Sequence, residues 1–386
     1  MAIWKVPLAD LQFGPEEIEA VTQVLQSGWI SQGPKVQQFE EAFAQFLGVE
    51  HALAVANGTA ALHLACMALS LGPGDEVLCP SLTFVATANA IRYTGAQPCF
   101  VDIAGPLDLN LSPTDAARKI TPRTKAVMVV HYAGFAADLG AIEEIAAQHS
   151  LAIIEDCAHA PGALYTSPPG NQKVGARGAI ACFSFFSNKN LTTGEGGMVV
   201  TNDPDLAERL RVARSHGMTT LTWDRHRGHS FSYDVVAPGY NYRLDEMRAA
   251  LGIVQLSRLA AGNARRRHLT TLYRQKLGEL PQVQLPFLSA DLEASACHLF
   301  PLLLSVEVDR RQFMSHLATH GIQTSIHYPP IHTFSYYRQL WPSGYDHQLP
   351  HTEDLAAREV TLPLYPTMTN QHLAEVAGAI RDFFKR

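Results

Sequence analysis

The sequence predicts an α/β fold, with a large domain built on a mostly parallel mixed sheet between helices and a smaller C-terminal α+β domain. Short, almost entirely apolar runs alternate with helical patterns over the first two-thirds of the 386 residues. Such near-continuous apolar strands are typical of parallel sheets that helices cover on both faces. The chain also exceeds one usual hydrophobic core, and 47% of its residues are hydrophobic. Two domains are therefore expected.

The elements of the large domain follow in order along the chain. The stretch VQQFEEAFAQFLG predicts an early helix that ends at Gly48, because one helical face carries Val36, Phe39, Phe43, Phe46 and Leu47. Further helices are predicted at 59–71 and 138–150. The predicted strands are apolar runs bounded by turn residues, at 52–55, 76–80, 97–103, 125–131, 151–156, 179–186 and 197–201.

Beyond residue 204 the pattern becomes mostly helical. Helices are predicted at 208–216, at 245–277 and around 370–385, with strands at 298–306 and 323–328. These elements predict a boundary between residues 1–245, an N-terminal arm with the large domain, and residues 246–386, the small domain. The polar, irregular segment 218–240 is too long for an ordinary linker, so we expect it to serve function or an interface.

Composition narrows the class of protein. A formal net charge of −6, without runs of Lys or Arg, argues against a nucleic-acid or membrane partner. The N-terminus does not resemble a signal peptide, and no apolar run approaches the length of a membrane span. The six cysteines are scattered singly without a CxxC pair, so neither a disulfide framework nor a metal site is predicted. We expect a soluble, cytoplasmic protein.

Lys189 stands out because it lies between two apolar runs predicted to be buried strands. Partial burial lowers the pKa of a lysine, and the neutral amine is the form that attacks a carbonyl to make a Schiff base. The alternative is a surface lysine on a connecting loop. Neighbouring features decide between the two.

Several polar residues follow predicted strands. Asp156 closes one strand, His131 closes another, and Ser184 with Lys189 lies at or past the end of a third. Because ligands bind at the carboxyl ends of strands in an open parallel sheet, we expect these groups to face one crevice.

A lysine that holds pyridoxal phosphate needs particular neighbours. A carboxylate must pair with the pyridine nitrogen, a helix N-terminus suits the phosphate, and a flat side chain should cover the ring. Asp156 fits the first role, although it could also be a helix cap. Residues 57–59 open a predicted helix, and Phe84, His159 and Ser184 lie at suitable places; each could instead be an ordinary core or turn residue.

Longer motifs carry a resemblance to a known family. ANGTAALHLA, PSLTFVATANA, EDCAHA, SFFSNKNLTTGEGG, GYNYRLDEMRAALGIVQL and GIQTSIHYPP occur in the order and approximate spacing of the DegT/DnrJ/StrS-type nucleotide-sugar aminotransferases. The similarity extends from LQSGWISQGPKV to LPLYP. It implies a pyridoxal-phosphate enzyme of the aspartate-aminotransferase fold, which is fold type I.

The resemblance also implies roles for residues that bind the cofactor. Lys189 would form the Schiff base with it, and Asp156 would pair with the pyridine nitrogen. Gly58 and Thr59 would contact the phosphate, with Ser184 beside them.

Three further positions complete this implied site. Phe84 would stack on the ring, and His159 occupies the place where many relatives have glutamine. Asn241, in the GYNYR stretch, would reach the phosphate held by the other subunit, which implies a homodimer with shared active sites. The resemblance leaves the role of His131 open, because VHYAGF departs from the VHLYG-like stretch of the family.

The implied reaction transfers an amino group, usually from L-glutamate, to a keto sugar linked to a nucleotide. Relatives that dehydrate carry histidine in place of Lys189, so the lysine favours transamination. The stretches SGWISQGPK and ANGTAALHLA resemble the branch that aminates carbon 4 of a 4-keto-6-deoxy hexose. Trp29, His327 and Tyr328 would then lie near the substrate, and dTDP-4-keto-6-deoxyglucose is the favoured acceptor.

Several alternatives remain open on sequence grounds. The acceptor could be a UDP- or GDP-linked keto sugar or a keto-cyclitol, and the chain could be a catalytically silent member of the family. A Schiff-base aldolase without pyridoxal phosphate ranks last, since it would have no use for Asp156. The basic stretch DRHRGHS at 224–230 could meet a pyrophosphate across a subunit interface or be a solvated loop.

Overall fold

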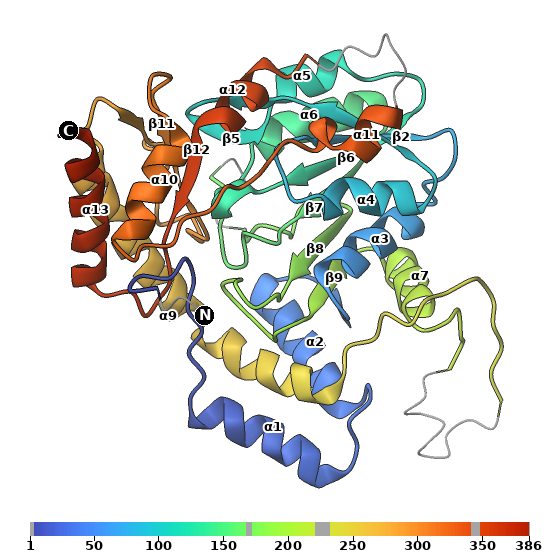
Figure 1. Ribbon diagram of the computed structural model, residues 1–386. Helices are drawn as coiled ribbons and strands as arrows, with labels where there is room; N and C mark the ends of the chain where they lie inside the picture. The colour runs from blue at the N-terminus through green and yellow to red at the C-terminus, as the bar shows by residue number, and fades with distance from the viewer. Residues whose placement is uncertain (1–3, 167–171, 221–231, 341–347, 386) are drawn as a thin grey trace.

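The computed structural model describes residues 4–166, 172–220, 232–340 and 348–385. A seven-stranded sheet with the strand order β1-β9-β8-β7-β6-β2-β3 lies at its centre (Figure 1). Its strands are β1 (His51–Val55), β2 (Glu76–Pro80), β3 (Gln97–Val101), β6 (Thr124–Val130), β7 (Ala152–Asp156), β8 (Ile180–Ser184) and β9 (Gly197–Thr201). β9 runs antiparallel to β1 and β8, and the other neighbouring pairs are parallel. The predicted mostly parallel mixed sheet is confirmed.

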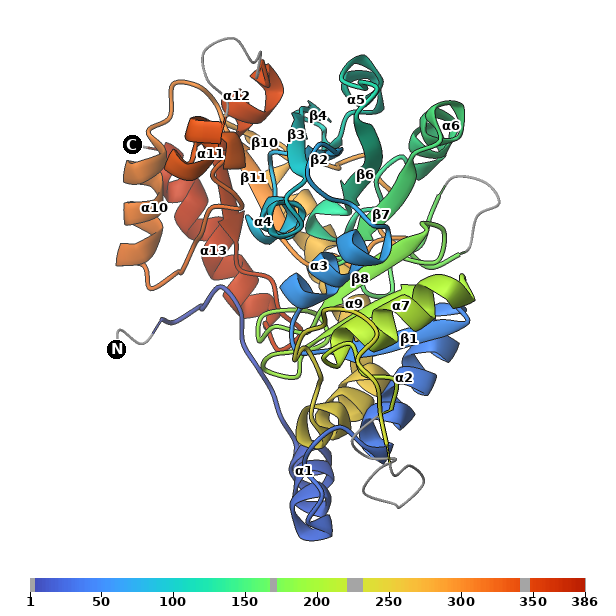
Figure 2. The same ribbon diagram turned by 90° about the vertical axis from the view of Figure 1, so that its right-hand side faces the viewer.

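Alternation of side chains along the strands builds one apolar core on each face of this sheet. In β6, Val127 and Val129 belong to one core, whereas Ala126 and Met128 belong to the other. The first core includes side chains of α2 (Pro34–Leu47), α6 (Leu139–His149) and α9 (Glu246–Leu277). The second includes those of α3 (Gly58–Ala68), α4 (Ala86–Tyr93), α7 (Pro204–Arg214) and α11 (Ser335–Leu340). Figure 2 shows these helices around the sheet.

Polar caps fix where the helices next to the sheet begin. The Asn57 side chain accepts a hydrogen bond of 2.8 Å from Ala60 N, which starts α3 directly after β1. Asp245 caps α9 in the same way, through a bond of 2.9 Å from Arg248 N. Because β1 is parallel to β8 through their shared neighbour β9, the N-terminus of α3 lies at the carboxyl end of β7 and β8.

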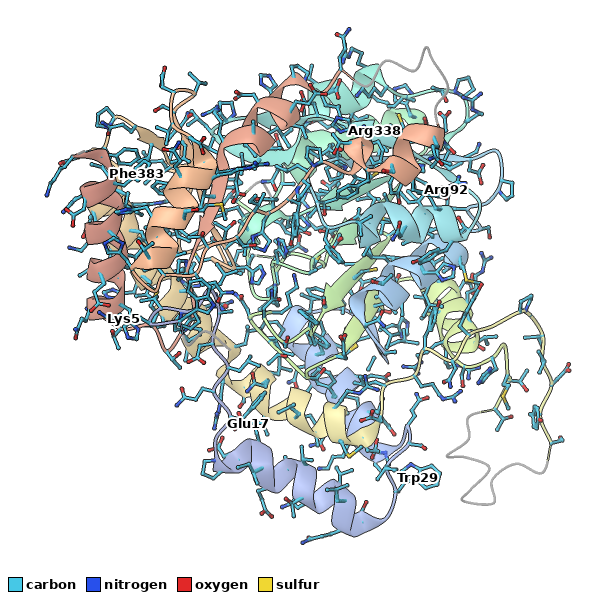
Figure 3. The ribbon with its side chains drawn as sticks, viewed as in Figure 1. Lys5, Glu17, Trp29, Arg92, Arg338 and Phe383 are labelled. Carbon is cyan, nitrogen blue, oxygen red and sulfur yellow. The ribbon has the colours of Figure 1, made fainter. Side chains whose placement is uncertain are left out.

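The C-terminal part has its own antiparallel sheet, in the order β10 (Val283–Gln284), β11 (Phe300–Leu304) and β12 (Glu359–Leu362). Side chains of α9, α10 (Arg310–Thr319) and α13 (Asn370–Phe384) pack in the core beside it. The N-terminal segment joins this part, because Lys5 forms a 2.9 Å ion pair with Glu375 and Val6 bridges Ile322 (Figure 3).

The remaining elements lie between or beside these layers. They are α1 (Pro15–Ser27), β4 (Ile103–Gly105), β5 (Asp108–Leu111), α5 (Pro113–Arg118), η1 (Tyr132–Gly134), η2 (Ile331–Thr333) and α12 (Pro350–Arg358). Figure 1 shows α1 at one end of the molecule beside the first half of α9. Within the described residues, no helix combines the length and hydropathy that a membrane span requires.

One predicted strand is wrong, and one predicted boundary stays a prediction. Residues 323–328 do not form a strand: they make a single bridge, between Ser325 and Thr361. The reason is that side chains take part in their backbone hydrogen bonds, as in the bond from His327 N to the Glu359 carboxylate. The boundary predicted after residue 245 falls at the start of α9, a 32-residue helix that contacts α1 and α2 and also α13. The division into two domains therefore stays a prediction.

Candidate active site

A cavity of about 500 Å³ opens where β7 and β8 end and α3 begins. Most of the residues predicted from the sequence line it, namely Gly58, Thr59, Phe84, Asp156, His159, Ser184, Lys189, His327 and Tyr328. The first seven come from the large sheet, its helices and the loops between them, whereas His327 and Tyr328 come from the segment before η2. Groups far apart in the sequence therefore face one space.

Lys189 lies in the turn that connects β8 to β9. Backbone bonds close this turn, with Phe185 N donating to Gly196 O at 2.8 Å and Lys189 N donating to Phe186 O at 2.9 Å. Burial lowers the pKa of the Lys189 amine to about 8, although the neighbouring Asp156 carboxylate opposes the shift. A substantial neutral fraction near pH 8 makes this amine a nucleophile and a proton carrier.

Asp156 is the last residue of β7, and 6% of its surface is exposed. Its Oδ2 accepts from Thr87 Oγ1 at 3.0 Å, and its Oδ1 accepts from Ala158 N at 3.2 Å. Burial raises the pKa of this carboxyl more than these bonds and Lys189 lower it. A cation bound beside Asp156 would compensate the desolvated charge.

The start of α3 forms a close-fitting cradle for an anion. The Asn57 side chain satisfies Ala60 N, which leaves the N–H groups of Gly58 and Thr59 without a partner inside the helix. A Cβ on Gly58 would come within 2.8 Å of Ser184 Cβ, so only glycine fits against β8 here. These N–H groups and the helix dipole favour a phosphate at this point.

Flat side chains surround the remaining space. Phe84 is 57% exposed, and its ring lies 6.0 Å from the ring of Tyr328, centroid to centroid. His159 Nδ1 accepts from Ala133 N at 3.4 Å, and its Nε2 lies 3.0 Å from the Tyr328 hydroxyl. Burial holds the pKa of His159 well below its usual range, so the ring is neutral and donates from Nε2.

His131 does not line this cavity, contrary to the expectation from its place after a strand. It is fully buried on the opposite face of the sheet, where Nε2 lies 2.9 Å from Glu155 Oε2 and Nδ1 accepts from Ala137 N. The cause is the alternation along β6, which turns Val130 toward the cavity and His131 to the opposite face, where Glu155 lies. Position at a strand end was not sufficient, because the face also decides access.

Two predicted residues lie outside this cavity. Asn241 is exposed and bridges Ser215, and Trp29 lies in the turn between α1 and α2 (Figure 3). The Trp29 indole N–H donates to Gln32 O at 3.2 Å. The stretch 224–230 lies outside the described residues.

Sequence reasoning missed other groups at the site. Thr87 holds the Asp156 carboxylate, and Phe186 lines the cavity with 44% of its surface exposed. Thr87 lies in the first turn of α4, four residues after Thr83, in the segment that follows β2. A pair of threonines so close after a predicted strand could have drawn attention to this position. The sequence pattern places Phe186 in an apolar strand. In the structure β8 ends at Ser184, and Phe186 is exposed because it lies beyond that end.

Comparisons with known proteins agree with this geometry. Residues 12–381 match the model of the DegT/DnrJ/EryC1/StrS aminotransferase family. The chain is 41% identical over 378 residues to the spore coat polysaccharide biosynthesis protein SpsC of Bacillus subtilis (strain 168), which covers 96% of this chain and 95% of that protein.

Similarity to solved structures supports the fold and indicates the cofactor. DesV of S. venezuelae, in complex with a ketimine intermediate, has a TM-score of 0.89 at 36% identity and covers 99% of both chains. The putative sugar aminotransferase Spr1654 of Streptococcus pneumoniae, in its PLP form, has a TM-score of 0.89 at 25% identity and covers 98% of both chains. This chain belongs to the DegT/DnrJ/EryC1/StrS aminotransferase family and is a pyridoxal-phosphate-dependent sugar aminotransferase.

Proposed function

We propose that the enzyme transfers an amino group from L-glutamate to carbon 4 of a 4-keto-6-deoxy sugar linked to a nucleotide, with dTDP-4-keto-6-deoxyglucose as the acceptor. The observation that carries this proposal is the meeting of Lys189, Asp156 and the N-terminus of α3 in one cavity. A desolvated amine, a desolvated carboxyl and an anion site are the three groups that pyridoxal phosphate needs.

The chemical nature and the positions of the residues that line the cavity suit pyridoxal phosphate. Gly58, Thr59 and Ser184 would hold its phosphate, and Asp156 would hold the protonated pyridine nitrogen. The raised pKa of Asp156 supports this, because the buried carboxyl lacks a full counter-charge within its own subunit. Phe84, which exposes its ring to the cavity, would cover one face of the cofactor.

When bound, pyridoxal phosphate supplies an electron sink that stabilises the charge left when a proton leaves the amino-bearing carbon. Lys189 Nζ would take that proton and return it, as general base and then general acid. Its pKa of about 8 suits both roles near neutral pH. The Nε2–H group of His159 donates a hydrogen bond to the Tyr328 hydroxyl and so orients the Tyr328 side chain in the cavity.

The acceptor sugar would lie between the large sheet and the segment that carries His327 and Tyr328. Both line the cavity, and both contact the large-sheet side, Tyr328 through His159 and His327 through Tyr132. The choice of carbon 4 is supported by the resemblance of residues 27–35 and 56–65 to one branch of the family, and that of dTDP by general similarity to the family. Trp29 would approach the substrate from another part of the assembly.

A homodimer would complete the site. Asn241 is exposed and does not line the cavity of its own subunit, as expected if it reaches the phosphate of a partner. Val235 and Val236 on the same segment are 55% and 59% exposed, and a partner subunit would cover them. The proposed location of the enzyme is the cytoplasm.

A panel of acceptors tests the proposed reaction. Purified enzyme with L-glutamate is offered dTDP-, UDP- and GDP-linked 4-keto sugars, a 3-keto sugar and a keto-cyclitol, and the amino products are identified by mass and NMR. Conversion of dTDP-4-keto-6-deoxyglucose with the highest kcat/KM is the expected result. If the enzyme preferred a 3-keto sugar, another nucleotide or a cyclitol, the proposed acceptor would be wrong. If no amino product formed, the proposed reaction would be contradicted.

A further inference from the structure

A buried carboxylate, Glu359, lies behind the substrate side of the cavity. It is fully buried on β12, and among the described residues no cationic side chain bonds its carboxylate oxygens. Oε2 accepts from His327 N at 2.9 Å, and Oε1 accepts from Thr361 Oγ1 at 2.5 Å. Nearby Arg310 donates to the carbonyl oxygen of Glu359 and not to its carboxylate. A buried acid with only neutral partners calls for an explanation, since isolated charges are costly to bury.

The local fold explains why this acid meets the cavity wall. Side chains alternate along β12, so Glu359 and Thr361 share one face while Val360 and Leu362 enter the apolar core. The backbone of Thr361 pairs with that of Ser325 through two bonds, of 2.8 and 3.2 Å. This pairing holds the Glu359–Thr361 face against residues 325–327.

His327 connects this face to the cavity. Its Nδ1 lies 2.8 Å from Thr361 Oγ1, and its carbonyl oxygen accepts from the Tyr132 hydroxyl. No described residue bonds Nε2, and His327 is one of the residues that line the cavity that also holds Lys189. The three side chains therefore form a continuous path of polar atoms from the buried Glu359 carboxylate to the cavity.

The chemistry of the three groups allows two arrangements of protons. When Glu359 is ionised, the Thr361 hydroxyl donates to it and accepts from His327 Nδ1–H, so Nε2 carries a lone pair. When Glu359 is protonated, it donates to Thr361, the Thr361 hydroxyl donates to Nδ1, and Nε2 carries the hydrogen. The two arrangements differ by one proton, which enters or leaves at Nε2 from the cavity while the two inner protons each move one bond along.

We propose that Glu359, Thr361 and His327 form a proton relay that sets whether His327 Nε2 donates a hydrogen bond to the substrate or accepts one from it. Glu359 and Thr361 are then positioning residues that act through His327. The inference rests on the proposed function for the identity of the bound oxygen, which would be a sugar hydroxyl or keto oxygen. It does not depend on which nucleotide the sugar carries.

The electrostatic surroundings agree with such a relay. Burial raises the pKa of Glu359 to about 8, although its bonds from Thr361 and His327 N and the charge of Arg310 on α10 oppose the shift. Burial and the charge of Lys189 lower the pKa of His327 to about 4, so the ring stays neutral in both arrangements.

Apart from Arg310 and Lys189, the titratable groups that face the relay are neutral near pH 8, because burial holds the pKa values of His159 and His298 well below their usual range. The hydroxyls of Tyr132 on η1 and Tyr328 both have raised pKa values, so neither adds a charge. Nε2 is therefore expected to donate below about pH 8 and to accept above it.

Nitrogen NMR of the holoenzyme tests the relay directly. Histidine labelled with ¹⁵N is followed from pH 6.5 to 9.5, with the His327 signals assigned by their loss in His327→Asn. In the wild type, Nε2 should change from the protonated to the unprotonated form with a midpoint near 8. Glu359→Gln should abolish the change. Thr361→Val should also abolish it, while Thr361→Ser, which keeps the hydroxyl, should retain it.

Kinetics provide a second readout. Because Lys189 also titrates near pH 8, the kinetic comparison is made between variants at one pH. We expect kcat/KM for the keto sugar to fall by about tenfold in Thr361→Val at pH 7. Circular dichroism and retained cofactor verify that the variants fold.

The outcomes separate this inference from the proposed function. One unchanging tautomer in the wild type, or a transition that persists in Glu359→Gln, would overturn the relay. The NMR measurement needs no acceptor, so a visible transition without sugar turnover would instead count against the proposed acceptor alone.

Discussion

Lys189 and Asp156 face one cavity, and burial shifts the pKa of each toward its neutral form despite their mutual attraction. The pKa of the amine falls to about 8, and that of the carboxyl rises. In water an amine and a carboxylate would both be fully charged at pH 7. The fold thus keeps the nucleophile reactive and leaves Asp156 in need of a cation, and both conditions favour capture of pyridoxal phosphate.

The first prediction concerns the pH dependence of that capture. Only the neutral Lys189 amine can attack the cofactor aldehyde, so the rate constant for covalent attachment to apoenzyme should rise with pH and level off above about 8. Stopped-flow absorbance between pH 6.5 and 9.5 measures it. A rate that still climbs steeply at pH 9.5 would show that the amine keeps an ordinary lysine pKa.

Replacing Lys189 itself should separate attachment from folding. We expect Lys189→Ala to lower the glutamate half-reaction by about 10²–10⁴-fold, the usual contribution of a general acid–base group, and to abolish covalent attachment. Borohydride reduction followed by mass spectrometry should find the cofactor on the wild-type chain and not on the variant. The matched control is Lys125→Ala, which removes an exposed lysine of β6. Full activity in Lys189→Ala would contradict the assignment.

The isosteric change Asp156→Asn should keep the fold and remove the negative charge. A carboxylate raises the pKa of a cationic partner by about 1–3. In the variant, the protonated fraction of the pyridine nitrogen should therefore fall by about 10- to 1,000-fold at fixed pH, and kcat should fall with it. Absorbance spectra and glutamate half-reaction rates measure both effects. Thr87→Val, which removes the 3.0 Å bond to Asp156, should show a smaller loss in the same direction.

How far the sequence predicts this molecule depends on the range of the interactions involved. The strands β2 and β9 match their predicted ranges, because strands buried on both faces of a covered sheet are continuous apolar runs that are visible locally. The edge of the sheet that carries Lys189 and Asp156 could also be predicted, since carboxyl ends of parallel strands meet there.

Other features depend on contacts that no local pattern reveals. The 323–328 segment has β-branched or aromatic residues at alternate positions (Thr324, Ile326 and Tyr328), which favour a strand. However, the Glu359 side chain of β12 takes the hydrogen bond of His327 N, and only Ser325 forms a bridge. Glu359 lies 32 residues after His327, and nothing in its own surroundings in the sequence marks it as a neighbour of the cavity. The face of His131 is predictable from the sequence. Side chains alternate along β6, so His131 lies on the same face as Val127 and Val129.

The glycine at the start of α3 offers a test of the phosphate site. A methyl group at Gly58 would meet Ser184 Cβ at 2.8 Å, and overpacking of about 1–3 kcal/mol corresponds to roughly a tenfold or larger loss of cofactor affinity. Equilibrium titration of apoenzyme with pyridoxal phosphate measures it. Gly378→Ala is the matched control, because no atom lies within 4 Å of the new Cβ; it should leave affinity unchanged and stabilise α13 by about 1 kcal/mol. Equal affinities for both variants would refute the cradle.

The last prediction concerns the shared active site. Lys189→Ala and Asn241→Ala should each have low activity at limiting cofactor. The first variant lacks the group that transfers the proton, and the second binds the cofactor phosphate weakly. In a mixed dimer, the Asn241→Ala subunit keeps its lysine and receives Asn241 of the partner subunit, so one of the two sites is intact. Random mixing in equal amounts should restore about a quarter of the wild-type sites, because half of the dimers are mixed and each has one good site.

Mixing after unfolding and refolding, or co-expression with two affinity tags, gives the required samples. Activity is measured on the doubly tagged fraction, in which about half of the sites should be intact because every dimer is mixed, and its dimeric mass is checked by light scattering. Recovery above both parent variants is the expected outcome. If Asn241 acted within its own subunit, each mixed dimer would contain one site without the lysine and one without the asparagine, and activity would not exceed the mean of the parents.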